Sequence, residues 1–95
     1  MIRHIVFFKL ADPSPEIVGR TLEILRGMRG KVEGMLELEA GANFLESERN
    51  YDISLMCLFS DRQSFDAYQT HPAHLPVKAH MHAVRIDSKA CDYEI

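Results

Sequence analysis

The sequence predicts a single α+β domain in which strands and helical regions follow the order β-α-β-β-α-β. An apolar run opens the chain, a helical stripe of apolar side chains follows, and two stretches of alternating apolar and polar residues come next. At 95 residues there is room for one domain, and we take residues 1–95 as that domain. The hydrophobic fraction of 46% is typical of a chain with a folded core.

The first element is a strand at Ile2–Leu10. This run is rich in Ile, Val and Phe and is short enough for a strand that is buried on both faces. Val6 and Phe8 share one face, whereas Ile5 and Phe7 share the other. The strand therefore predicts apolar neighbours on both sides of its sheet.

A helix is predicted over residues 15–29. Ser14 is suited to cap it, Pro15 suits its first turn, and Gly30 is a natural stop. The apolar positions that recur with helical spacing are Ile17, Val18, Thr21, Leu22, Leu25 and Met28.

The next two elements are strands because the apolar period changes from helical spacing to alternation. In the first, Leu36, Leu38 and Ala40 alternate with glutamates, which gives the strand one wet face. The second runs over residues 51–59, where Ile53, Leu55, Cys57 and Phe59 alternate with residues on the opposite face. That opposite face carries Met56 and Leu58, which are also apolar.

The last third of the chain predicts a broken helical region and a closing strand. Ser60–Gln63 resembles a capping box in which Gln63 reaches back, and it opens a helix through about Gln69. Pro72 breaks this helix. A third helical piece runs to about Met81, and residues 84–95 form the final strand.

This order is typical of ferredoxin-like folds, with a four-stranded antiparallel sheet and helices on one face. The opposite sheet face must meet water, a ligand or a second sheet. Because Met56, Leu58, Ile5 and Phe7 make that face apolar, we expect a homodimer whose two sheets pack into a dimeric α/β barrel.

Charge and cysteine content exclude several classes of function. Eleven Lys and Arg against fourteen Asp and Glu give a net charge of −3, and no basic run is present, so nucleic acid is not an expected partner. No stretch approaches the ~20 apolar residues that a membrane span needs. Cys57 and Cys91 form no C-x-x-C motif and are expected to be packed free thiols, which predicts a reducing, cytoplasmic location.

Tyr68–His74 is the segment with the best candidates for chemistry. Proton transfer near neutral pH needs a group such as histidine. His74 follows the Pro72 break, and the positive end of a helix dipole disfavours imidazolium, so His74 could act as a base with the Tyr68 hydroxyl as a hydrogen-bond donor. The alternative is structural: Tyr68 packs, while His71 and His74 cap the break by hydrogen bonds.

The other histidines predict no metal centre. His4, in mid-strand, is by itself typical of a core histidine bonded to backbone. His80 and His82 lie near a helix end, where positive side chains are favoured. No H-x-x-x-H pair has a carboxylate partner, and no glycine motif that binds phosphate is present, so we expect no metal and no cofactor.

Four segments together resemble the stress-responsive dimeric A/B barrel (Dabb) family. They are His4–Leu10, Tyr51–Asp52, the Tyr68-x-x-His71-Pro72-x-His74 segment and Asp92–Glu94. The likeness runs from end to end of the chain. It implies a homodimer of ferredoxin-like subunits whose sheets face each other, in a family where most members have no assigned reaction.

One plant member of this family is a cofactor-free polyketide cyclase. Its catalytic tyrosine and histidine match Tyr68 and His74, and a histidine of its pocket matches His4. A further pocket histidine is replaced by Ile53 here, and helix one lacks the aromatic residues of that pocket, so the cyclase substrate does not carry over. Plant relatives also hold a cation on backbone carbonyls, at positions that correspond to Arg29, Val32 and Met35.

Two classes of function remain open. One is a cofactor-free lyase, cyclase or isomerase acting on a carbonyl compound, and the other is a non-catalytic stress-response dimer that binds a small apolar ligand. Barrel relatives that are monooxygenases fit less well because tryptophan is absent. We predict a catalytic pair, Tyr68 and His74, and substrate contacts at His4, His71, Val6 and Phe8.

Overall fold

A computed structural model of the protein describes residues 1–95 and contains the expected order of strands and helices. The strands are β1 (Ile2–Leu10), β2 (Met35–Ala42), β3 (Ile53–Phe59) and β4 (Arg85–Glu94). The helices are α1 (Pro15–Arg26), α2 (Arg62–Tyr68) and α3 (Leu75–Val84). The break expected at Pro72 separates α2 from α3.

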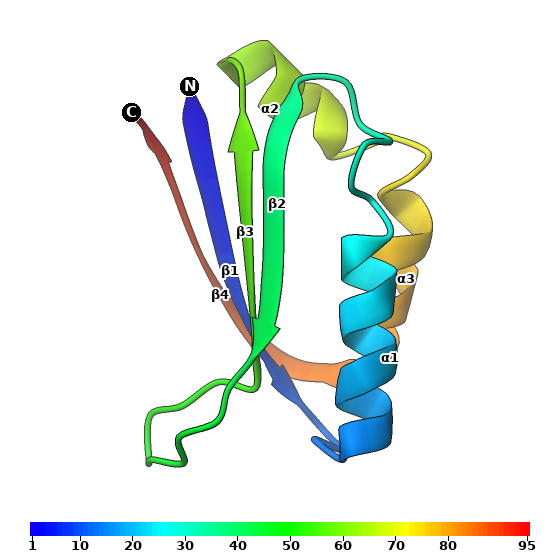
Figure 1. The fold of residues 1–95 in the computed structure, drawn as a ribbon, viewed down its shortest axis with the longest axis vertical. Helices are drawn as coiled ribbons and strands as arrows, with labels where there is room; N and C mark the ends of the chain where they lie inside the picture. The colour runs from blue at the N-terminus through cyan, green and yellow to red at the C-terminus, as the bar shows by residue number, and fades with distance from the viewer.

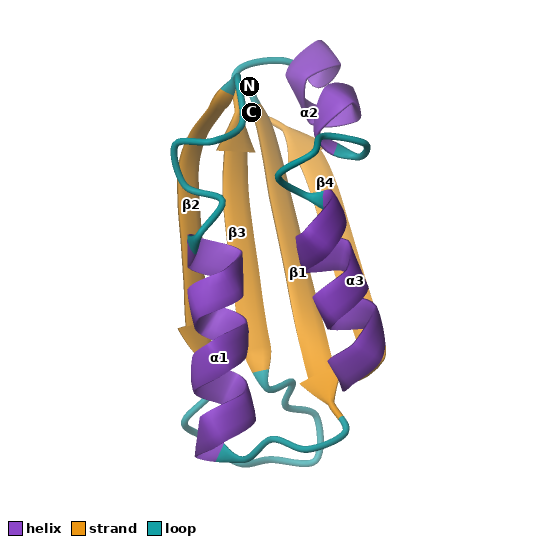
Figure 2. Ribbon diagram, turned by 90° about the vertical axis from the view of Figure 1, so that its right-hand side faces the viewer, coloured by secondary structure: helices purple, strands orange, loops and turns teal.

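The four strands form one antiparallel sheet in the order β2-β3-β1-β4. All three helices lie on the same side of this sheet, and the other face is bare (Figure 1). Seen from the helix side, α1 runs in front of β2 and β3 while α3 runs in front of β1 and β4 (Figure 2). The predicted ferredoxin-like α+β fold is therefore confirmed.

Helix α1 begins where the sequence predicts but ends three residues earlier. Ser14 caps it, since its side chain accepts a hydrogen bond from the Ile17 amide at 3.4 Å. After Arg26 the chain tightens into turns, in which the Arg29 amide bonds the carbonyl three residues before it. The left-handed backbone of Gly30, with φ of 79°, then reverses the chain.

The cap of helix α2 is Asp61 rather than the expected Ser60–Gln63 box. A carboxylate oxygen of Asp61 accepts the Ser64 amide at 2.7 Å, which satisfies one of the unpaired donors of the first turn. Gln63 does not reach back. These hydrogen bonds lower the pKa of Asp61 because they stabilise its charged form.

A β-bulge places Leu36 differently from the expected alternation. The register of β2 on β3 shifts between Met35, opposite Phe59, and Glu37, opposite Leu58, so that Leu36 is the extra residue. Its side chain is 55% exposed, although Leu38 beyond the bulge is buried as expected.

The core lies between the helices and the sheet, whereas the bare sheet face remains partly apolar. Leu25 and Phe59 are completely buried in the core. On the bare face Phe7 is 43% exposed, but Leu58 is only 7% exposed, so it is already covered within the subunit. The expected apolar open face is therefore present, and Phe7 and Tyr93 are its exposed aromatic residues.

The two cysteines are unpaired, as expected, but they differ in environment. Cys57 is buried in the core, and burial raises the pKa of its thiol to about 12. Cys91 is exposed and pairs in register with Ile5 on the bare face, so the expected apolar packing applies to Cys57 alone.

Candidate functional site

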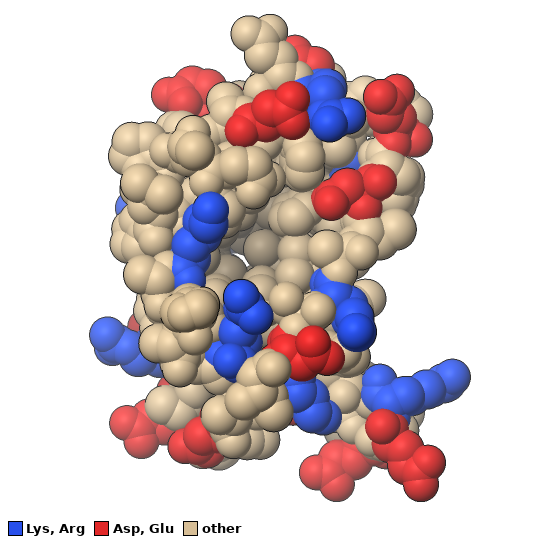
Figure 3. Space-filling view, turned by 180° about the vertical axis from the view of Figure 1, so that it is seen from behind, with Lys and Arg blue, Asp and Glu red and all other residues tan.

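A pocket of about 570 Å³ lies between α3 and the sheet. We call it the helix-side pocket. Viewed from the side of α3 and β4, the surface is hollowed between the helices and the sheet, with basic side chains at the rim of the hollow (Figure 3). The pocket is lined by His4, Phe8, Leu55, Tyr68, Gln69, His74, Val77, Lys78, Ala79, Met81, His82, Arg85 and Ser88.

His74 stands at the start of α3 with one ring nitrogen fixed and the other free. Its Nδ1 lies 2.9 Å from the backbone carbonyl of Tyr68, and because a carbonyl only accepts, Nδ1 must carry the proton. Nε2 of the neutral ring then holds a lone pair. No buried side-chain nitrogen lacks a partner, so this unpaired Nε2 is accessible rather than enclosed.

The surroundings of His74 keep the imidazole neutral at physiological pH. Burial lowers its pKa below the ordinary value, and the nearby charges of Lys78 and His4 lower it further. The hydrogen bond to the Tyr68 carbonyl acts in the opposite direction without reversing the shift. The expectation of a depressed pKa is met, but its largest cause is burial rather than the helix dipole.

His4 reaches the same pocket from β1 and is held by Asp92 of β4. The two residues are direct partners in the antiparallel register, and the carboxylate of Asp92 accepts from Nδ1 of His4. The His4 ring also packs edge-on against Phe65 and Tyr68, with centroids 5.5 and 5.9 Å away. Asp92 therefore fixes the orientation of the His4 ring. A carboxylate that bonds one ring nitrogen of a histidine also sets the role that the other nitrogen can play.

Tyr68 lies under His74 and is 1% exposed. The two rings stack with their centroids 3.8 Å apart and 14° between their planes. The Tyr68 hydroxyl donates to the sulfur of Met28 at 3.8 Å, and a thioether is a weak acceptor. Burial raises the pKa of this hydroxyl, with a smaller contribution from Cys57, so it remains a donor and cannot serve as a base.

The remaining residues assigned to substrate contact separate into two groups. Phe8 lines the helix-side pocket beside His4. Val6 is buried in the core and does not line it. His71 also lies elsewhere: Nε2 bonds Glu33 at 3.0 Å and Nδ1 accepts the Ala73 amide at 3.0 Å, which commits both ring nitrogens to shaping the break between α2 and α3.

Sequence reasoning missed Asp92, Lys78 and Arg85. Asp92 could have been found by writing β4 antiparallel to β1, because that register sets it opposite His4. Lys78 and Arg85 carry no local signal, since a basic residue on an exposed helix or at a strand start is ordinarily solvated. Only the position of α3 over the sheet brings them to the pocket.

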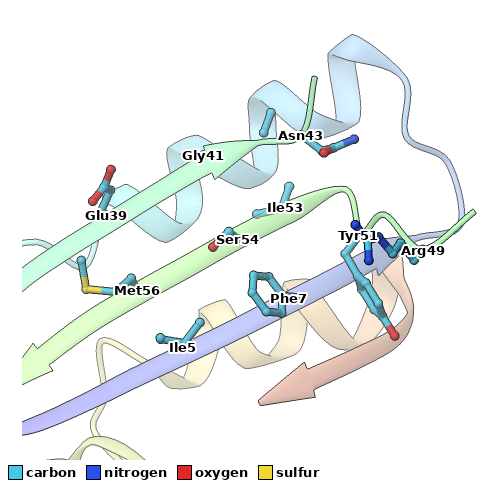
Figure 4. A pocket seen from close by; sticks show the side chains of 11 residues that line it. Ile5, Phe7, Glu39, Gly41, Asn43, Arg49, Tyr51, Ile53, Ser54 and Met56 are labelled. Carbon is cyan, nitrogen blue, oxygen red and sulfur yellow. The ribbon is translucent and has the colours of Figure 1, made fainter. Parts of the chain in front are cut away.

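A second concavity, of about 590 Å³, lies on the bare sheet face. Ile5, Phe7 and Met56 project there from β1 and β3, and Tyr51 and Arg49 close one end (Figure 4). The Tyr51 hydroxyl donates to Asp87 at 2.6 Å, which raises the pKa of Tyr51 and lowers that of Asp87. This concavity contains no histidine, so of the two concavities only the helix-side pocket holds groups suited to proton transfer near neutral pH.

Neither metal binding by side chains nor membrane insertion has a matching feature. No group of three or more His, Cys, Asp or Glu side chains is placed to hold a metal ion. None of the helices combines the length and apolarity needed to traverse a bilayer.

Comparison with solved structures places the fold among dimeric proteins. A dimeric ferredoxin-like protein of unknown function from Thermobifida fusca is 25% identical with a TM-score of 0.89, over 99% of this chain and 90% of that one. Hydroxynitrile lyase from Passiflora edulis has a TM-score of 0.84 at 15% identity, over 99% of this chain and 92% of that one. At that identity the likeness to the lyase shows a shared fold.

Sequence comparison identifies the family. An uncharacterised protein of Streptomyces coelicolor, SCO4036, is 32% identical over 77 residues, which are 78% of this chain and 79% of that protein. The family model described as the stress responsive A/B barrel domain matches residues 2–95. The chain therefore belongs to the Dabb family of stress-responsive A/B barrel proteins.

Proposed function

We propose that this protein is a homodimer in which each subunit binds a small, largely apolar carbonyl compound in the helix-side pocket and removes a proton from it without a cofactor. The observation that carries this proposal is the state of His74. Its Nδ1 is committed to the Tyr68 carbonyl, its pKa is lowered, and Nε2 is left as an accessible proton acceptor. A neutral imidazole held in this way is suited to act as a general base.

The other polar groups of the pocket would act on the substrate oxygen. Tyr68 stays protonated, and a substrate oxygen is a better acceptor than the sulfur of Met28 that its hydroxyl now meets. His4, oriented by Asp92, would donate from Nε2 when it is protonated. Hydrogen bonds to a developing negative charge stabilise it more than they stabilise the neutral carbonyl.

One fold relative supports a lyase-type reaction, and another supports the homodimer. The Passiflora fold relative is a hydroxynitrile lyase. The dimeric T. fusca relative and the exposed Phe7 face support a homodimer formed through the bare sheet face.

A second candidate function is non-catalytic binding of the same class of ligand. It is favoured by the burial of Tyr68, because the hydroxyl already has a partner in Met28 and 1% exposure leaves little access for a ligand. In this case His74 and Tyr68 would stabilise the break between α2 and α3.

The experiment that separates the two measures proton exchange. Apolar aldehydes, ketones and cyanohydrins are incubated with the protein in D₂O, and exchange or cleavage is followed by NMR. If His74 is the base, His74→Gln should lower the rate by about 10²–10⁴-fold, and Tyr68→Phe should lower it less because the stacked ring is retained.

The matched control is His80→Gln, since His80 bonds Thr21 outside the pocket. This variant should keep the wild-type rate. Binding of the panel without any exchange above background would favour the non-catalytic function, and an unchanged rate in His74→Gln would remove His74 as the base.

A further inference from the structure

The lining of the helix-side pocket is basic although the protein is acidic. Lys78 and Arg85 line it together with three histidines, whereas no Asp or Glu side chain does. The whole chain has a net charge of −3, so the positive lining is a local feature rather than a reflection of composition. Figure 3 shows basic side chains bordering the hollow on more than one side.

Neither cation is paired with a carboxylate. The Lys78 ammonium donates to the backbone carbonyl of Gln69 at 3.2 Å, and no salt bridge involves Lys78 or Arg85. The acid nearest to Arg85 in sequence, Asp87, is bound to Tyr51 on the bare face of the sheet. Asp92 is held by His4. Neither cation forms an ion pair, although the charge of Arg85 contributes to the lowered pKa of Asp87.

The charge of Lys78 acts inside the pocket. Lys78 lies one helical turn after His74 and lines the same pocket, and its charge is one of the causes that lower the pKa of His74. The deeper part of the pocket is apolar, with Phe8, Val77 and Met81 buried. A ligand that matches both parts has an apolar body and one anionic end.

We propose that the ligand of the helix-side pocket is an amphipathic carboxylate. Its carboxylate meets the positive charge that Lys78 and Arg85 supply to the lining, and its apolar chain extends toward Phe8 and Met81. The inference rests on the proposed function only for the choice of pocket, because an anion bound by these two cations requires no proton transfer.

The test is a competition between two ligands that share a ten-carbon chain and differ in whether the head group is anionic or neutral. N-phenyl-1-naphthylamine, an uncharged fluorescent probe of apolar pockets, is bound to the protein and displaced by decanoate or by decan-1-ol. Charge-assisted hydrogen bonds are about twice as strong as neutral ones, so decanoate should displace the probe at an about tenfold lower concentration than decanol. The preference should shrink as salt is raised.

Two charge-matched double variants locate the anion. Lys78→Gln with Arg85→Gln should abolish the preference for decanoate while leaving displacement by decanol unchanged. Arg20→Gln with Lys31→Gln removes the same net charge from outside this pocket and should keep the preference.

The outcomes separate this proposal from the proposed function. Equal displacement by decanoate and decanol, or a preference that survives in the Lys78/Arg85 variant, would overturn the anionic ligand without bearing on His74. Stronger displacement by decyl phosphate than by decanoate would replace the carboxylate with a phosphate. Failure of the probe to bind would show that the pocket does not accept apolar ligands, and both proposals would then fall.

Discussion

The imidazole of His74 lies on the ring of Tyr68, with centroids 3.8 Å apart, and the same tyrosine accepts the Nδ1 proton of His74 through its backbone carbonyl. The Tyr68 ring therefore fixes the plane of the His74 ring, and the Tyr68 carbonyl fixes which nitrogen of His74 is protonated. Because the carbonyl survives any substitution at position 68, the contributions of the ring and of the hydrogen bond can be separated.

We expect the pKa of His74 to depend on the Tyr68 ring and not on its hydroxyl. Burial is the largest cause of the depressed pKa, so Tyr68→Phe, which keeps the ring, should leave it low. Tyr68→Leu opens the stack to water and should raise the pKa toward the ordinary value for histidine, about 6.5. NMR titration of the His74 ring protons measures the pKa in each variant. Equal His74 pKa values in Tyr68→Phe and Tyr68→Leu would contradict this account.

Phe7→Glu should dissociate the proposed dimer. Phe7 is 43% exposed in the subunit, and covering such a side chain contributes up to about 1.5–3 kcal/mol, once per subunit in a symmetric interface. The glutamate would in addition bury a charge, so the dissociation constant should rise by about 10²-fold or more. Light scattering would then report the 10.9 kDa monomer at micromolar concentration.

The control for this substitution is Leu75→Glu. Leu75 is 50% exposed but lies on α3, on the opposite side of the sheet, so the dimer should persist. A monomeric wild-type protein, or a dimer lost equally in both variants, would argue against association through the bare face. Leu58 is a poor choice for this test because it is already buried within the subunit.

Gly34→Ala should destabilise the protein more than Gly30→Ala. Both glycines have φ near +80°, where a side chain costs about 1–2 kcal/mol. A Cβ at Gly30 meets nothing within 4 Å, whereas at Gly34 it would lie 2.2 Å from the Ser64 hydroxyl and 2.5 Å from its Cβ. Overpacking adds typically about 1–3 kcal/mol at Gly34.

Urea denaturation measures this difference as a shift of midpoint at constant slope. Gly19→Ala provides a control of opposite sign. Gly19 lies within α1 and has open space around it, so alanine should raise the free energy of unfolding by about 0.5–1 kcal/mol. Equal destabilisation at positions 30 and 34 would mean that Ser64 moves aside at no cost.

The fold was predictable from sequence because its signals are local and repeated. The apolar run of β1, the Ser14 cap and the alternation in β3 each report a short stretch of chain, and together they specify the topology. Leu36 was misplaced because a bulge changes the period of alternation without leaving a proline or glycine to mark it.

The candidate site was only partly predictable because it is assembled across elements. His4, Phe8, Tyr68 and His74 were named and lie together in the pocket. His71 is a histidine only three positions before His74, yet its side chain bonds Glu33 and does not line the pocket. The partners that complete the pocket come from α3 and β4, and their contribution follows from packing rather than from any motif.

The last prediction concerns His80, whose ring links α3 to α1 through a 2.9 Å hydrogen bond between Nε2 and the fully buried Thr21 hydroxyl. Burial lowers the pKa of His80 in the folded protein, and the charge of Arg20 lowers it further. The unfolded chain then binds more protons than the folded chain below about pH 6.5, so His80 favours unfolding as acid is added. Its full contribution to stability is present above that pH and is lost as the pH falls through the lower folded-state pKa.

The melting temperature of the wild type should therefore fall between pH 7 and pH 5. The carboxylates of Glu33, Asp61 and Asp87 titrate only at lower pH, because their pKa values are lowered from 4.5 for Glu33 and from 3.8 for the two aspartates. His80→Gln retains a hydrogen-bonding side chain without the titrating group, and Arg20→Gln removes the neighbouring charge. The melting temperature of both variants should therefore fall less than that of the wild type between pH 7 and pH 5. Calorimetric profiles of the two variants that run parallel to the wild-type profile would show that the stability of the α1–α3 contact does not depend on protonation of His80.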